Sequence, residues 1–265
     1  MTIDRVNAHF HEAKRYFPDD NIVGIFLQGS QNYGLETPHS DVDTKLVVTP
    51  TFRQIAFNKQ PVSSTHVRAN DEHIDFKDLR LYIDTFRKQN INFVEILFTQ
   101  YFILNHTYTD EFMRLINARE DIAHYNPYRA IKAMKGMALE KHHALEHRYP
   151  AKDGVIERYG YDGKQLSHLI RILDFMTRYI NGDSYASCLQ ANDKEYLIAL
   201  KEQGYYTLEK ARSVADETAA AVVALADSYC ANHPDSFDEK TEKLLQDVQY
   251  NIMEISVRKE LSITK

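Results

Sequence analysis

The segment from Ile22 to Val48 constrains the fold most, because it places two strand-like apolar runs around a polar turn. The run from Ile22 to Leu27 has the length of a strand and is followed by Gly29 and Ser30, and the next apolar run is Leu46 to Val48. We therefore expect a strand, a turn, a short helix or loop, and a second strand. The beginning of the chain should form part of a sheet.

Two carboxylates stand at the start of the second strand. Asp41 and Asp43 are two residues apart, so both side chains point to one face of the strand. Such a pair repels itself unless a cation lies between, and carboxylate oxygens beside a phosphate suit Mg²⁺. Gly29 allows close backbone approach to a phosphate, and Ser30 offers a hydroxyl at the mouth of the following helix. Gly29-Ser30 alone is also explained by an ordinary capped turn, and Asp41 with Asp43 alone by a solvated strand start. The two motifs together favour a site for a metal ion and a triphosphate.

Gly29-Ser30, ten intervening residues and Asp41-Val42-Asp43 together resemble the signature of the DNA polymerase beta-type nucleotidyltransferase superfamily. Members usually carry a third carboxylate on a later strand, for which Asp75 is the candidate. Gly-Ser-x-x-Tyr-Gly with Ser-Asp-Val-Asp is similar to a narrower bacterial and phage group of predicted nucleotidyltransferases, some linked to RNA repair. A second segment resembles that group too: Gly160-Tyr161-Asp162-Gly163-Lys164 with His168 and Arg171.

The resemblance implies a small, palm-like mixed sheet domain and transfer of an NMP from an NTP to a hydroxyl. Two Mg²⁺ ions, with Mn²⁺ as an alternative, would be held by Asp41, Asp43 and Asp75, the catalytic residues. Ser30 and the backbone of Gly29 would bind the departing pyrophosphate. RNA or tRNA is the leading acceptor, a protein or small molecule is the second, and a non-catalytic nucleotide-binding regulator remains a third reading. The sequence leaves the base of the NTP and the oligomeric state open.

Periodicity along the rest of the chain predicts an α+β fold with a catalytic domain over 1–107 and an α-helical domain over 108–265. In the first part we expect a helix over 2–16 with solvated His9 and His11, a helix or loop over 53–67, a strand over 72–79 and helical turns over 79–98. In the second part the expected helices are 110–118, 127–147, 164–180, 195–199, 207–231 and 238–257.

Several charged residues have two readings at this stage. Lys45 shares the parity of Asp41 and Asp43, so it either neutralises the carboxylates or reaches a phosphate. Lys77 shares the parity of Asp75 and either counters triphosphate charge or pairs with an acid. Glu95 is expected in a buried salt bridge, with a fourth cleft carboxylate as the alternative.

The helical part contains a basic region. Residues 129–178 hold ten Lys or Arg against six Asp or Glu, about +4, whereas the whole chain carries −6. A polyanionic substrate would favour such a region, and ordinary helix-surface charge explains it too. Lys164, His168 and Arg171 share one helix face and are predicted to bind nucleotide or substrate phosphate, although core packing with a solvated polar face gives the same pattern.

Composition restricts the setting. Cys188 and Cys230 lie far apart without metal-ligand spacing, which favours a reducing compartment. No apolar run approaches membrane-spanning length, and residues 1–14 lack the apolar core of a signal peptide. We therefore expect a cytoplasmic protein without a membrane partner.

Overall fold

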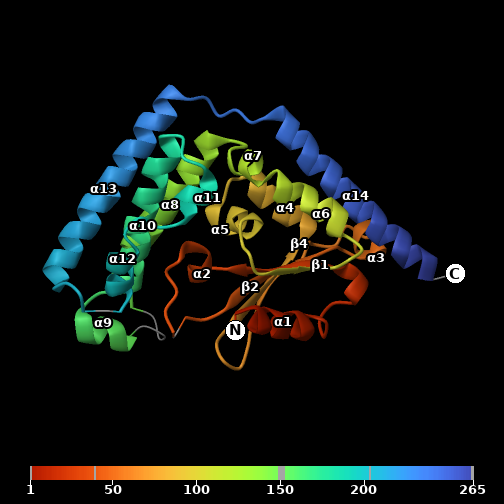
Figure 1. Ribbon diagram of the computed structural model, residues 1–265, viewed down its shortest axis with the longest axis horizontal. Helices are drawn as coiled ribbons and strands as arrows, with labels where there is room; N and C mark the ends of the chain where they lie inside the picture. The colour runs from red at the N-terminus through yellow and green to blue at the C-terminus, as the bar shows by residue number, and fades with distance from the viewer. Residues whose placement is uncertain (1, 39, 149–152, 203, 264–265) are drawn as a thin grey trace. The chain divides into compact units, whose positions relative to one another are not determined.

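A computed structural model describes residues 2–38, 40–148, 153–202 and 204–263 (Figure 1). The chain forms two compact units. The sheet unit comprises residues 1–32, 39–126 and 237–265, and the helical unit comprises residues 33–38 and 127–236. The expected α+β class, a sheet region followed by a helical region, is confirmed.

The compact units divide the chain differently from the expected domains 1–107 and 108–265. Residues 108–126 belong to the sheet unit, and so does the last helix, α14 (Glu239–Ile263), which packs on α4 (Leu79–Arg87) and α6 (Thr109–Asn117). Helical periodicity alone does not tell which helices cover a sheet, because a sheet-covering helix and a bundle helix share the same repeat.

The sheet has five strands in the order β3-β4-β2-β1-β5. Their bounds are β1 Ile22–Gln28, β2 Asp43–Val48, β3 Ser63–Val67, β4 His73–Asp78 and β5 Phe102–Leu104. β2 and β4 are parallel, and the other neighbouring pairs are antiparallel. The connection from β2 to β4 runs through α3 (Phe52–Ala56) and β3, and it returns the chain so that β4 points the same way as β2.

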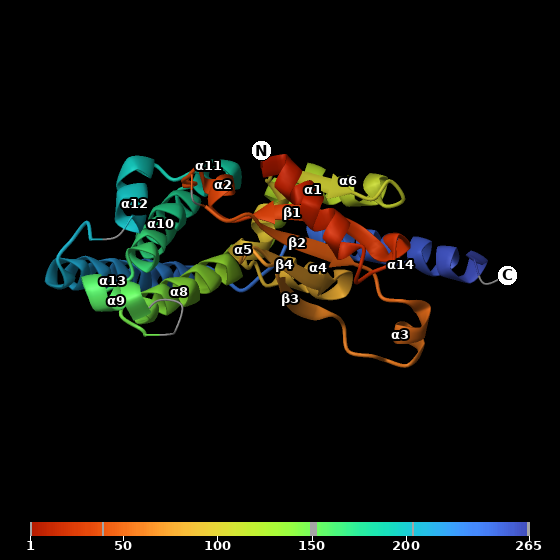
Figure 2. The ribbon, with the colours of Figure 1, turned by 90° about the horizontal axis from the view of Figure 1, so that it is seen from below.

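One face of the sheet packs against α1 (Thr2–Ala13), which Figure 2 shows lying along the strands. This core is apolar because alternate residues of each strand point into it. Its buried members are Val6, Ala13, Ile22, Ile25, Leu27, Val42, Leu46, Val48, Ile74 and Phe76. Asp43 and Lys45 of β2 and Asp75 and Lys77 of β4 have the other parity and therefore point to the opposite face.

Helical segments pack on that opposite face. Phe26 of β1 stacks on Phe112 of α6 at 4.9 Å, and Lys45 of β2 lies 4.1 Å from the ring of Phe93 in α5 (Ile91–Val94). The short helices η2 (Glu95–Leu97) and α7 (Arg119–Ala123) complete this layer, and η1 (Asp19–Asn21) precedes β1. At Gly24 a Cβ atom would lie 2.8 Å from Leu104, so glycine lets β5 approach β1 closely.

The helical unit is built around α10 (Gly163–Ile180), which packs on α8, α11, α12 and α13. Those helices span α8 Pro127–Ala144, α9 Asp153–Tyr159, α11 Tyr185–Leu189, α12 Lys194–Lys201 and α13 Leu208–Asn232. Residues 33–38, which follow the Gly-Ser turn in the sequence, also belong to this unit. The four-residue helix α2 (Ser30–Tyr33) therefore runs from one unit into the other.

The expected strands at 22–27, 46–48 and 72–79 are present as β1, β2 and β4, and the expected long helices are present within a few residues. The segment 53–67, expected as a helix or loop, instead contains α3 and then the edge strand β3. That strand is largely exposed and polar, so it lacks an apolar alternation. Among the described residues no helix is both long and apolar enough to cross a membrane.

Candidate active site

The parallel pair β2 and β4 brings the predicted polar residues onto one sheet face. Its register sets Lys45 opposite Asp75, and Asp43 and Lys77 follow at two-residue intervals on the same sides of their strands. Gln28, the last residue of β1, pairs with Asp43, so Gly29 and Ser30 follow directly beside the acidic strand.

Asp43 and Asp41 keep carboxylate oxygens available. The Asp43 Oδ1 atom accepts the backbone N–H of His73 at 2.9 Å and lies 3.1 Å from the His73 Nδ1 atom. Asp43 Oδ2 has no partner among the described residues. Asp41 lies just before β2 and is exposed, with its backbone carbonyl accepting from Gln31 Nε2 at 3.0 Å. Both carboxylates are therefore open to a cation.

Asp75, by contrast, is fully engaged. Its Oδ1 atom accepts from Thr65 Oγ1 at 2.6 Å, and its Oδ2 atom accepts from Gln28 Nε2 at 3.2 Å and Lys45 Nζ at 3.3 Å. Burial raises the pKa of Asp75, but the Thr65 hydrogen bond and the Lys45 charge outweigh it and hold the pKa below its usual value. Asp75 is therefore ionised at neutral pH.

The two lysines of this face differ in their partners. Lys45 is 4 % exposed and forms an ion pair with Asp75, which favours its reading as a neutralising residue. Lys77 Nζ lies 4.5 Å from the centre of the Phe93 ring and has no carboxylate partner among the described residues. Burial lowers the pKa of Lys77, the charge of Lys45 lowers it further, and Asp75 opposes the shift. Lys77 therefore remains available to an anion.

The Gly-Ser turn differs from the expected phosphate cradle. Gly29 adopts φ = +99°, which favours glycine, but its N–H already donates to Glu95 Oε1 at 3.0 Å. Glu95 is buried, and its observed role is to hold this turn. Helix α2 has only four residues, so its dipole contributes little at Ser30. The Ser30 hydroxyl has no partner among the described residues, and it is the donor that the turn still offers.

A buried network behind the acidic strand was not predicted from the sequence. Glu72, whose side chain is 1 % exposed, accepts from the Val42 N–H at 3.2 Å and from Arg68 Nη1 at 2.7 Å, and it also pairs with Arg5. Burial raises the pKa of Glu72, but the hydrogen bonds from His9 and other donors lower it to about 2. Because Val42 lies between Asp41 and Asp43, Glu72 fixes the backbone that carries both acids.

His9 corrects an expectation. Predicted to be solvated, it is fully buried, with Nε2 2.9 Å from Glu72 Oε2 and Nδ1 2.9 Å from the Thr44 hydroxyl. Burial lowers the pKa of the imidazole despite the bond to Glu72. The spacing of Val6, His9 and Ala13 places all three on one helix face, and this signal would have identified His9 as buried.

The carboxylates do not form a preassembled three-ligand centre. Within residues 2–38, 40–148, 153–202 and 204–263, no three His, Cys, Asp or Glu side chains gather as ligands for one ion. Asp41 and the free oxygen of Asp43 are nevertheless hard donors, the type that Mg²⁺ takes together with water and phosphate oxygens. This donor set fits a magnesium ion bound through two carboxylates.

The predicted residues of the helical unit lie along α10. Asp162 caps this helix by accepting the N–H of Lys164 at 2.9 Å, and His168 and Arg171 follow on the same face. Arg171 is buried, with its guanidinium carbon 3.9 Å from the centre of the Tyr33 ring. Tyr161, in the same motif, is fully buried and exchanges hydrogen bonds with the backbone of Tyr206.

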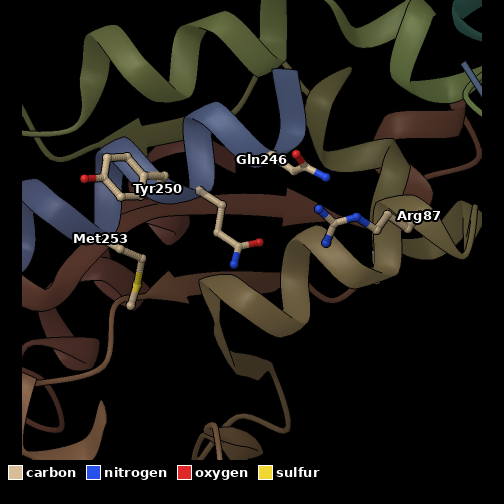
Figure 3. A pocket seen from close by; sticks show the side chains of 5 residues that line it. Arg87, Gln246, Tyr250 and Met253 are labelled. Carbon is tan, nitrogen blue, oxygen red and sulfur yellow. The ribbon is translucent and has the colours of Figure 1, made fainter. Parts of the chain in front are cut away.

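The sheet unit also contains a pocket. It has a volume of about 320 Å³ between α4 and α14, where Arg87 faces Gln246, Tyr250 and Met253 (Figure 3). The Arg87 guanidinium is held by Glu242, with Nη2 3.1 Å from Oε1. No residue predicted for the active site lines this pocket.

No known family model matches this chain, and a comparison with curated proteins gives no match either. The functional assignment therefore depends on the site itself and on the resemblance of its motifs.

Proposed function

We propose that this protein is a magnesium-dependent nucleotidyltransferase that moves an NMP from an NTP to a hydroxyl acceptor. The observation that carries the proposal is the arrangement on β1, β2 and β4. Asp41 precedes β2 and Asp43 begins it, both with oxygens available. Asp75 lies on the neighbouring strand, and Ser30 follows the strand that pairs with Asp43. An acidic pair beside a serine turn is the donor set that a metal-bound triphosphate requires.

Asp41 and Asp43 would hold Mg²⁺ in this proposal, with Mn²⁺ as an alternative. Two ions are expected from the resemblance, and Asp75 would help to hold the second. Bound Mg²⁺ supplies charge neutralisation on the phosphates and acidifies the acceptor hydroxyl. The chain contributes the remaining polar groups: the Ser30 hydroxyl and the Lys77 ammonium for phosphate oxygens.

In the proposed step, the NMP passes from the NTP to the acceptor hydroxyl. The acceptor oxygen attacks the α-phosphorus of the NTP and forms the new P–O bond. The bond from that phosphorus to the α,β-bridging oxygen breaks, and pyrophosphate leaves with the bond electrons. Asp75, ionised at neutral pH, takes the proton of the acceptor hydroxyl. The position of Asp75 beside Lys45 keeps this carboxylate fixed on the sheet.

RNA, including tRNA, is the acceptor that we propose. Its support is the excess of basic residues over 129–178, in which Lys164 and Arg171 have no ion-pair partner among the described residues. Cys188 and Cys230 form no disulfide, which suits a reducing compartment, and we propose a cytoplasmic location.

The test is a transfer assay with Mg²⁺ and each of the four NTPs, labelled at the α-phosphate, with and without total RNA. Asp41→Asn/Asp43→Asn is the inactive control, and Asp193→Asn, which changes an exposed acid of the helical unit, is the matched control. We expect label in RNA for the wild type and for Asp193→Asn only. Label in protein would replace RNA by a protein acceptor. NTP binding without transfer to RNA, protein or small molecules would contradict the proposed enzyme and favour a regulator.

A further inference from the structure

Arg171 is a buried cation without a counter-charge. It is 3 % exposed, and its Nε atom has no hydrogen-bond acceptor. Within the described parts of the chain, its guanidinium forms neither an ion pair nor a hydrogen bond. The guanidinium lies over the ring of Tyr33. A ring face replaces only part of the lost hydration of a guanidinium. The site is therefore electrostatically incomplete.

The neighbours of Arg171 add positive charge. Lys164 and His168 share its helix face, and neither side chain has a hydrogen-bond partner among the residues described. From α12, Lys201 donates to the backbone carbonyl of Leu35 at 2.6 Å, and it forms no ion pair among the described residues. We call Lys164, His168, Arg171 and Lys201 the α10 cation cluster.

The pKa values in the cluster show the same imbalance. Burial lowers the pKa of His168 well below its usual value, and the charges of Arg171, Lys164, Lys141 and Lys201 lower it further. Burial also lowers the pKa of Lys201, followed by the charge of Lys164, while Glu36 opposes the shift. These side chains therefore act mainly as like charges toward one another.

Several other basic residues of the helical unit have acidic partners. Arg129 Nε lies 3.0 Å from Asp235 Oδ1, and Arg178 Nη2 lies 2.7 Å from Asp174 Oδ2. Ordinary helix-surface charge therefore explains those residues but not the α10 cation cluster. Burial of Arg171 distinguishes the cluster from a solvated face, where a lone arginine has water around it.

We propose that the α10 cation cluster binds a terminal phosphate group, without needing a metal ion. A phosphate dianion offers oxygens to a guanidinium and two ammonium groups at once, and it would supply the missing negative charge. An NTP and a 5′-phosphorylated RNA end share this chemistry. The inference rests on the proposed function only for the source of the phosphate, because binding itself requires no transfer.

The direct test is calorimetric titration of the full chain with inorganic tripolyphosphate in EDTA, at pH 7 and fixed salt. Arg171→Met should weaken binding at least about tenfold, since it removes a charge-assisted contact. Lys201→Met should weaken it too and gives a second variant if Arg171→Met fails to fold. Arg129→Met removes the same charge from an arginine that is already paired. Equal weakening by Arg129→Met and Arg171→Met, or no binding by the wild type, would overturn the proposal.

Competition then identifies the source of the phosphate. Displacement of tripolyphosphate by ATP but not by a 5′-phosphorylated oligonucleotide assigns the cluster to the NTP. Displacement by the 5′-phosphorylated oligonucleotide, and not by its 5′-hydroxyl form, assigns it to the RNA end. Equal displacement by both oligonucleotides would overturn the terminal-phosphate assignment. Asp41→Asn/Asp43→Asn should still bind tripolyphosphate in EDTA, so lost transfer with retained binding separates the two proposals.

Discussion

Buried charges of the sheet unit such as Glu72 and Lys45 are paired with opposite charges, whereas the helical unit contains a buried arginine without an ion pair among the described residues. In the sheet unit, Glu72 is surrounded by Arg5, His9 and Arg68, and Asp75 is paired with Lys45. In the helical unit, buried Arg171 has no opposite charge among the described residues. Removing one member of an ion pair leaves the other charge unpaired, whereas removing an unpaired ion removes a buried charge that had no partner. The first arrangement stabilises the folded state by itself, and the second is completed by a ligand.

The largest stability effect is expected at Glu72. Glu72→Gln should lower the free energy of unfolding by about 3 kcal/mol, because it removes a buried carboxylate that two arginines and His9 contact. Urea unfolding measures it. Glu12→Gln makes the same chemical change at a more exposed carboxylate that also bonds Arg68, and it should lower the free energy by less than about 1 kcal/mol. Equal losses from the two variants would contradict the role given to the buried network.

Lys45→Met should have the next largest effect. It keeps the apolar stem over Phe93 but leaves Asp75 without its ion pair, so we expect a loss of about 2 kcal/mol in the free energy of unfolding. The double variant Lys45→Met/Asp75→Asn should recover part of that loss, as a double-mutant cycle would measure. Without any recovery, the two residues would not act as a pair.

Arg171→Met should act in the other direction. Without ligand we expect unfolding free energy to remain unchanged or to rise by up to about 1 kcal/mol, since the variant removes an unpaired buried charge and keeps apolar volume. The measurement is urea unfolding in a buffer free of phosphate. A loss as large as that of Lys45→Met would mean that Arg171 is already compensated, and the contrast between the units would fail.

The smallest effect is expected on the pH dependence of stability. The pKa of His168 is lowered in the folded state, whereas in the unfolded chain it is about 6.5. Below about pH 6.5 the unfolded chain therefore binds a proton that the folded chain does not bind. Stability should therefore fall as the pH drops from 7.5 to 5.5. His168→Gln should flatten this slope, while the same substitution at exposed His11 should not. An unchanged slope in His168→Gln would contradict a lowered pKa of His168 in the folded state.

Sequence patterns predicted the elements that depend on local periodicity. The apolar runs of β1, β2 and β4 and the long helices α8, α10 and α13 have repeats that a sequence displays directly. Parity matched Lys45 with Asp43 and Lys77 with Asp75, and the β2–β4 register adds that Lys45 lies beside Asp75.

Features that depend on distant partners were not predictable in this way. The sequence around Glu72 does not indicate its partners, because Arg5 and His9 lie more than sixty residues away. The backbone of Gly29 was expected to bind pyrophosphate, but its N–H donates to Glu95. Some ion-pair partners of residues 129–178 lie on α13. Such pairs arise from tertiary packing and have no fixed spacing.

The central claim is transfer of the α-phosphoryl group, and double labelling tests it most directly. The wild-type enzyme would be incubated with Mg²⁺, total RNA and the active NTP carrying different labels on its α- and γ-phosphates. The account predicts that the α-label enters the acceptor while the γ-label is released as pyrophosphate in equal amount, and that Asp41→Asn/Asp43→Asn does neither. Entry of the γ-label into the acceptor, or an active double variant, would contradict it.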